Sequence, residues 1–179
     1  MEQIQSCYGA SELRKKWKTQ YEISAQRRDK DFLSLGARVL LERLAPDLLS
    51  AEQLHDVIEA GFYNLEEKQE VQETCDLWLE YWGKFKTRFI PMGLSFAELE
   101  KKLDGGLYSV AGWLLEIAEA LDQCGQKQQS YLQKKIDYCE EYMTIFPDAY
   151  ENHAIEIMEQ KSGTLFELEQ VESGDECYE

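Results

Sequence analysis

Residues 113–147 read WLLEIAEALDQCGQKQQSYLQKKIDYCEEYMTIFP. Apolar residues recur every three or four positions in both halves of this stretch, a spacing that puts them on one face of a helix. Gly125 and the polar residues after it separate the halves, and Pro147 ends the second. The stretch predicts two amphipathic helices joined by a short turn. Its apolar positions are Trp113, Leu114, Ile117, Ala118, Leu121, Leu132, Ile136, Cys139, Met143 and Phe146.

The same pattern appears on both sides of this stretch. Upstream, apolar residues run at helical spacing from Leu54 to Leu65 and from Val71 to Trp82, with the charged turn 66–68 between them. Ser50 followed by Gln53 is typical of a helix N-terminus. Downstream, a third hairpin is predicted from about residue 148. Its first helix carries Ser162, Leu165 and Leu168, and its second carries Val171, Gly174 and Tyr178.

Strand-like alternation is nearly absent, so the sequence predicts an all-α fold in a single domain, 1–179. An N-terminal helix pair is expected in 1–48, with helices at about 11–28 and from Phe32 to Leu44, before Pro46. Hairpin 1 follows in 50–87. A loop with a short helix, capped by Ser95 and Glu98, fills 88–106. Hairpin 2 spans 108–147, and an incomplete hairpin 3 spans 148–179.

These hairpins resemble degenerate tetratricopeptide-type (TPR-like) helical repeats over residues 52–87 and 108–179. In hairpin 2 the apolar and small pair 117–118 matches the position where two helices cross, and Gly125 matches the turn. Hairpin 3 has Glu169 in place of that glycine, hairpin 1 has no glycine in its turn, and residues 83–106 interrupt the repeat. The resemblance implies a right-handed superhelix of stacked antiparallel hairpins, with a groove that grips a peptide or partner helix.

Charge and composition restrict the function. The net charge is −16, and residues 1–45 hold nine Lys or Arg against six Asp or Glu, leaving ten against 29 in the rest. Such a field repels phosphate backbones, so no nucleic-acid partner is expected. There is no apolar run long enough for a membrane, and the five cysteines form no Cys-x-x-Cys pair. We therefore predict a cytoplasmic protein with no membrane partner and no cofactor.

The favoured function is a non-enzymatic interaction scaffold or adaptor. Its acidic groove is expected to take a basic or amphipathic peptide or protein, because residues 140–179 hold twelve acids and a single base, Lys161. Because hairpin 3 is incomplete, self-association through it is also predicted. Groove position selects the partner-binding residues, which are Tyr108, Trp113, Tyr150, Glu151, His153 and Glu156.

The alternative is a Mg²⁺-dependent enzyme. Carboxylates three or four residues apart share a helical face and can hold a divalent cation. The pattern resembles the Glu-Glu-x-x-Glu and Glu-x-x-Asp signature of all-α nucleoside triphosphate pyrophosphohydrolases, although the two halves lie further apart here. The resemblance implies magnesium ligands at Glu66, Glu67, Glu70, Glu119 and Asp122. The pairs Glu52/His55 and His153/Glu156 lack the further ligands that a di-iron site needs, so no metal is assigned to them.

Overall fold

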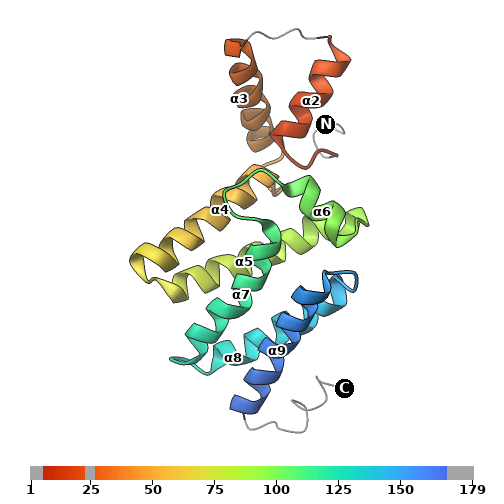
Figure 1. Ribbon diagram of the computed structural model, residues 1–179. Coiled ribbons are helices and arrows are strands. Elements are labelled where there is room, and N and C mark those ends of the chain that lie inside the picture. The colour runs from red at the N-terminus through yellow and green to blue at the C-terminus, as the bar shows by residue number, and fades with distance from the viewer. Residues whose placement is uncertain (1–5, 23–26, 169–179) are drawn as a thin grey trace. The chain divides into compact units, whose positions relative to one another are not determined.

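Every regular element that the computed structural model describes, in residues 6–22 and 27–168, is helical (Figure 1). For residues 27–30 only the backbone is described. The all-α prediction is therefore confirmed for this part of the chain. The α-helices are α2 (Ala10–Gln20), α3 (Arg27–Leu44), α4 (Ala51–Tyr63), α5 (Val71–Phe89), α6 (Phe96–Leu103), α7 (Val110–Gly125), α8 (Ser130–Ile145) and α9 (Glu151–Glu167). A π-helix, η1 (Asn64–Lys68), and a 3-10 turn, η2 (Ile90–Met92), complete the list.

The chain divides into two compact units, Met1–Asp56 and Val57–Glu179. In the first, α2 packs on α3 around a small core of Cys7, Ala10, Leu13, Ala37 and Leu41. The predicted first helix at 11–28 was wrong, because α2 ends at Gln20 and α3 begins at Arg27. The Glu52 carboxylate accepts hydrogen bonds of 3.0 Å from the backbone N–H groups of Ala10 and Ser11. Glu52 therefore serves the N-terminus of α2.

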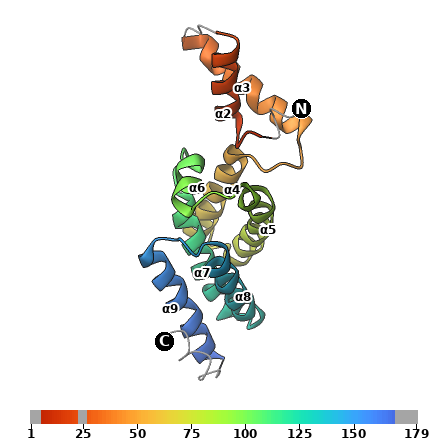
Figure 2. The same ribbon diagram turned by 90° about the vertical axis from the view of Figure 1, so that its right-hand side faces the viewer.

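In the second unit the packing centres on helix α7 (Figures 1 and 2). Helix α7 contacts α5, α8 and α9, and α8 contacts α9. The core between them is mainly aromatic, and its largest fully buried side chains include Trp78, Phe85, Phe89, Trp113, Tyr138 and Tyr142. The two hairpins predicted on either side of residues 88–106 are therefore present as α4–α5 and α7–α8.

Each hairpin brings its two helices together at a glycine. A Cβ atom on Gly61 of α4 would lie 2.2 Å from Nε1 of Trp78 on α5. One on Gly125 of α7 would lie 2.1 Å from Cδ2 of Leu132 on α8. The two glycines therefore permit close approach. In the α4–α5 turn, which has no glycine, Gln69 takes the left-handed backbone conformation with φ 58°.

The segment predicted as a loop is more regular than expected. Helix α5 continues through Gly83 to Phe89, and the predicted cap of α6 is present, with Glu98 N–H donating to Ser95 Oγ at 3.3 Å. The Ser50–Gln53 cap of α4 is also present. Within the described residues, no helix combines the length and apolar character that crossing a membrane requires. The second helix of hairpin 3 was predicted in 169–179, which lies outside those residues.

Candidate functional site

Tyr108, just before α7, lies at the edge of helix α4. Its ring stacks on Phe62 of α4 with the centroids 3.9 Å apart and the planes 16° apart. Beside it, the backbone N–H of Leu107 donates to Glu59 Oε1 at 3.1 Å. Partial burial raises the pKa of Tyr108, and the negative charges of Glu66 and Glu59 raise it further. Tyr108 therefore lies within reach of two carboxylates.

Glu116 on α7 links this edge to helix α9. Its side chain is partly buried, and burial raises the pKa of its carboxyl group. The charges of Glu119, Glu156 and Glu66 raise the pKa further. Glu119 is one turn along α7, Glu156 is on α9, and Glu66 is on η1. Four acids from three separate elements, η1, α7 and α9, therefore repel one another in the second unit.

We call this region the acidic surface, which consists of Glu59, Glu66, Glu116, Glu119 and Glu156. None of these five carboxylates forms an ion pair with a lysine or arginine in the described part of the chain. Glu119 accepts a hydrogen bond of 3.1 Å from the side-chain amide of Gln160 on α9, which is neutral. No lysine or arginine between residues 57 and 168 therefore balances the charge of the acidic surface through an ion pair.

An aromatic corner lies beside the acidic surface, where α6 meets the α8–α9 connection. It consists of Phe96, Tyr142, Tyr150 and His153. The Phe96 backbone N–H donates to Asp148 at 2.9 Å, which fixes the start of α6 on that connection. Ring centroids in the corner lie 5.3 to 6.4 Å from that of Phe96, all at steep interplanar angles. Edge-to-face contacts of this kind hold the rings in defined positions.

Two buried polar atoms in the aromatic corner lack a partner. Tyr142 is fully buried, and neither its hydroxyl nor His153 Nδ1 has a hydrogen-bond partner among the described residues. Glu100 on α6 accepts a hydrogen bond of 2.9 Å from the Tyr150 hydroxyl. Burial raises the pKa of Tyr142, and the charges of Glu156 and Glu100 raise it further. The charges of both carboxylates therefore act on the buried hydroxyl.

The predicted partner-binding residues divide between surface and core. Tyr108, Tyr150, Glu151, His153 and Glu156 all retain some exposure, and four of them belong to the acidic surface, its edge or the aromatic corner. Glu151 is exposed in the first turn of α9. Trp113 is a correction, because it is fully buried and its ring packs edge-on against Phe85 with centroids 5.8 Å apart. Large aromatic residues at helical spacing more often pack in the core than contact a partner.

The predicted magnesium ligands lie in different surroundings. On α7, Glu119 accepts a hydrogen bond from the side-chain amide of Gln160 on α9. Asp122 instead forms an ion pair with Lys135 of α8, with Oδ1 and Nζ 2.5 Å apart. Glu70 lies 3.7 Å from Lys68. Glu66 contributes to the acidic surface, and Glu67 is exposed on η1. No three His, Cys, Asp or Glu side chains are grouped so that they could hold a metal ion in residues 6–22 and 27–168.

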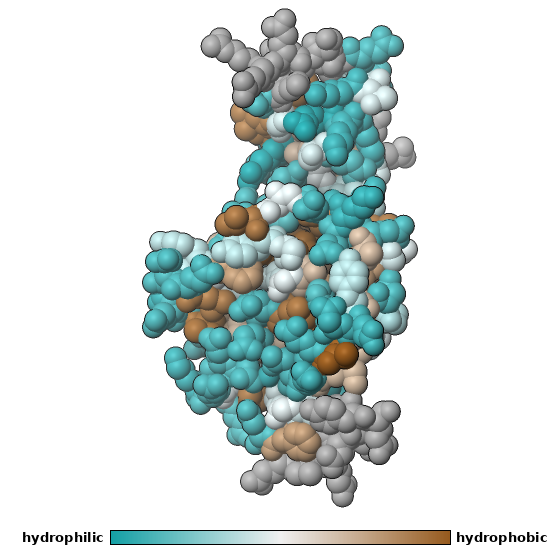
Figure 3. All heavy atoms as spheres, in the orientation of Figure 1, coloured by the Kyte–Doolittle hydropathy of each residue, from teal (hydrophilic) through white to brown (hydrophobic). Residues whose placement is uncertain are grey.

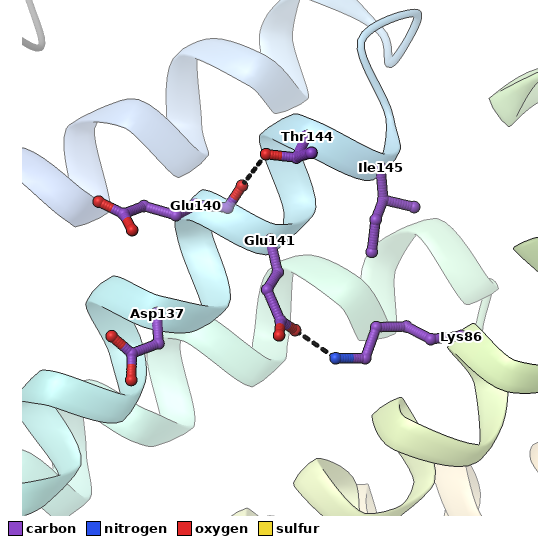
Figure 4. Close-up of a pocket in the computed structure, with 6 residues that line it drawn as sticks. All are labelled: Lys86, Asp137, Glu140, Glu141, Thr144 and Ile145. Carbon is purple, nitrogen blue, oxygen red and sulfur yellow. Dashed lines mark hydrogen bonds and ion pairs between the residues drawn. The ribbon is translucent and has the colours of Figure 1, made fainter.

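A shallow pocket between α5 and α8 differs from the acidic surface (Figure 4). Lys86 of α5 points to Glu141 of α8, and their Nζ and Oε2 atoms are 2.5 Å apart. Trp82 Nε1 donates to the same carboxylate at 2.8 Å. Glu140, also at this pocket, pairs with Lys161 of α9 at 3.0 Å. Glu140 and Glu141 are therefore each paired with a lysine, whereas Asp137 of the same pocket accepts a hydrogen bond from the neutral Gln133 amide.

The visible face of helices α5 to α9 is mainly hydrophilic, with hydrophobic residues in small separate groups (Figure 3). Neither protein-family models, nor curated proteins, nor solved structures gave a match to this chain. The candidate site therefore depends on geometry and charge.

Sequence reasoning missed Glu59, Glu100 and Glu116. Glu59 and Glu116 are on the first helices of the two hairpins, so assigning those helices to one side would have selected them. Glu100 could not be found this way, because its place depends on how α6 docks on the α8–α9 connection.

Proposed function

We propose that this protein is a non-enzymatic interaction scaffold that binds a basic or amphipathic segment of a protein partner on the acidic surface. The supporting observation is the set of five carboxylates that no lysine or arginine of the described residues neutralises. A cationic partner would relieve their mutual repulsion, so charge complementarity favours its association. The partly buried Glu116 gains most, because attraction between charges is stronger away from water.

The arrangement of helices supports the same proposal. Helices α7, α8 and α9 pack on one another, as expected for TPR-like repeats, and the acids of the acidic surface come from α4, η1, α7 and α9. In a stack of hairpins, the first helices line one side and together form an extended binding surface. We propose that α4, α7 and α9 play this part, in a cytoplasmic protein.

The test uses a designed amphipathic helical peptide made of lysine and leucine, labelled with fluorescein. We expect saturable binding that weakens as salt rises above about 0.15 M, where charges are screened beyond roughly 8 Å. The triple substitution Glu116→Gln, Glu119→Gln and Glu156→Gln should weaken binding at least tenfold. A peptide with glutamate in place of every lysine is the control.

Binding that the triple substitution leaves unchanged, equal binding of the glutamate peptide, or no binding of the lysine peptide at low salt would each refute the proposal. No observation favours the alternative enzyme in the same way, since Glu119 and Asp122 turn to different helices. It stays a prediction, which an assay for Mg²⁺-dependent pyrophosphate release from nucleotides would test.

A further inference from the structure

The aromatic corner combines features that suit one kind of cation. Glu100 and Glu156 supply negative charge, and the Tyr142 hydroxyl and His153 Nδ1 are buried polar atoms without partners among the described residues, each able to accept a hydrogen bond, His153 in the tautomer that carries its proton on Nε2. A buried polar atom without a hydrogen bond lowers the stability of the folded state. The fold therefore carries a cost here that a ligand with several N–H donors would remove.

The number of acceptors distinguishes between the two common basic side chains. An ammonium group has three donors around a point, whereas a guanidinium has five in a planar fork that suits carboxylates. Two carboxylates, a hydroxyl and an imidazole nitrogen offer more acceptors than an ammonium can use. Tyr150 is 42% exposed at the edge of the corner and adds an aromatic ring on which a guanidinium can stack.

We infer that the aromatic corner binds the guanidinium of an arginine side chain from the partner, between Glu100 and Glu156 and against the Tyr142 hydroxyl. This inference rests on the proposed function, because the arginine belongs to the basic segment on the acidic surface. The Tyr142 hydroxyl is shielded from water in the free protein, so a surface side chain has to move aside on binding. Tyr150 fits this role, since it is exposed and its hydroxyl is held by Glu100.

The experiment compares two fluorescein-labelled peptides, identical except that the basic positions are all lysine in one and all arginine in the other. We expect the wild-type protein to bind the arginine peptide about tenfold more tightly, because the lysine peptide lacks at least one hydrogen bond that the charged guanidinium makes. Tyr142→Phe and Glu100→Gln should each remove most of this preference while leaving the lysine peptide nearly unaffected. Tyr81→Phe and Glu73→Gln on α5 are the matched controls and should leave the preference unchanged.

Folding is checked separately by thermal melting. Tyr142→Phe removes a hydroxyl that makes no hydrogen bond, so its melting temperature should not fall. If the variant nevertheless fails to fold, Glu100→Gln alone decides the test. Equal binding of both peptides, or a preference that survives Tyr142→Phe and Glu100→Gln, overturns the arginine site and leaves the scaffold standing. If neither peptide binds at low salt, the scaffold proposal fails first.

Discussion

The acidic residues of the second unit lie in two kinds of surroundings, one with lysine partners and one without them among the described residues. Between α5, α7, α8 and α9, the carboxylates of Asp76, Asp122, Glu140 and Glu141 each lie within 4 Å of a lysine nitrogen. We call these four acids and their lysines the ion-paired region. On the acidic surface, five carboxylates have no such neighbour. The chain has only 19 basic residues for 35 acidic ones, so where the bases are placed decides which acids stay unbalanced.

The two regions should respond in opposite ways when a charge is removed. In the ion-paired region the carboxylate is part of a favourable contact, so neutralising one partner leaves the other desolvated and unpaired. On the acidic surface the carboxylates repel one another, so neutralising one relieves repulsion. Stability measurements on single variants can therefore separate structural acids from acids kept for a partner.

The largest effect is expected for Lys135→Met. The Lys135 side chain is 3% exposed and pairs with Asp122, which is 23% exposed. Replacing the lysine leaves a partly buried carboxylate without its cation, at a cost of about 3 kcal/mol in the free energy of unfolding. Urea denaturation measures this change. Lys134→Met is the matched control, since the Lys134 side chain is 43% exposed and its Nζ lies 3.7 Å from Asp76 Oδ1, and it should cost less than about 1 kcal/mol. Equal costs for both variants would show that the buried pair has no special role.

A smaller effect, with a definite pH dependence, is expected for Glu141→Gln. Burial raises the pKa of Glu141, but hydrogen bonds from Lys86 and Trp82 and the Lys86 charge outweigh it and lower the pKa. The ionised form is therefore favoured in the folded state. Its contribution, about 1 kcal/mol at neutral pH for a half-exposed pair, is present above the ordinary pKa of glutamate and disappears as pH falls through the lowered value.

Urea denaturation of the wild type and Glu141→Gln at several pH values measures this contribution. The difference between the two proteins should be constant near neutral pH and vanish in acid. A difference that persists unchanged at the lowest pH where the protein folds would contradict the assigned ion pair.

The smallest effect, of opposite sign, is expected for Glu116→Gln on the acidic surface. Because the folded-state pKa of Glu116 is raised, ionisation opposes folding, and stability should rise as pH falls from neutral through the raised value. The amide should therefore stabilise the protein at neutral pH, by about 0.5 kcal/mol. This stabilisation is tested by comparing the melting temperatures of the wild type and Glu116→Gln at low salt, with Glu73→Gln as the control. A lower melting temperature for Glu116→Gln would mean that this carboxylate is a structural contact.

Much of the helical fold could be predicted from local signals. Capping at Ser50 and Ser95 and the aromatic spacing from Trp78 to Phe89 depend on neighbours within one or two turns, so the sequence shows them directly. The predictions that failed depend on contacts between elements. Phe32, an apolar residue at the predicted start of its helix, is 75% exposed, and the described core of the first unit is made by residues of α2, α3 and the segment before α2.

The candidate site was harder to predict for the same reason. Glu156 was selected for its expected position in the groove, and the structure adds that its charge raises the pKa of Glu116 on α7. Gly125 was expected to lie in the turn, whereas it is the last residue of α7 and makes room for Leu132. Helical periodicity assigns a residue to a face, but which helix covers that face depends on packing.

The pKa of Glu116 is the most direct measure of whether the acidic surface binds a cationic partner. Its side-chain carboxyl carbon can be followed by NMR as pH is varied, with and without the lysine–leucine peptide. The account predicts a pKa above the ordinary range of glutamate in the free protein, and a clear fall once the peptide is bound. An ordinary pKa in the free protein, or a raised value that saturating peptide does not lower, would contradict it.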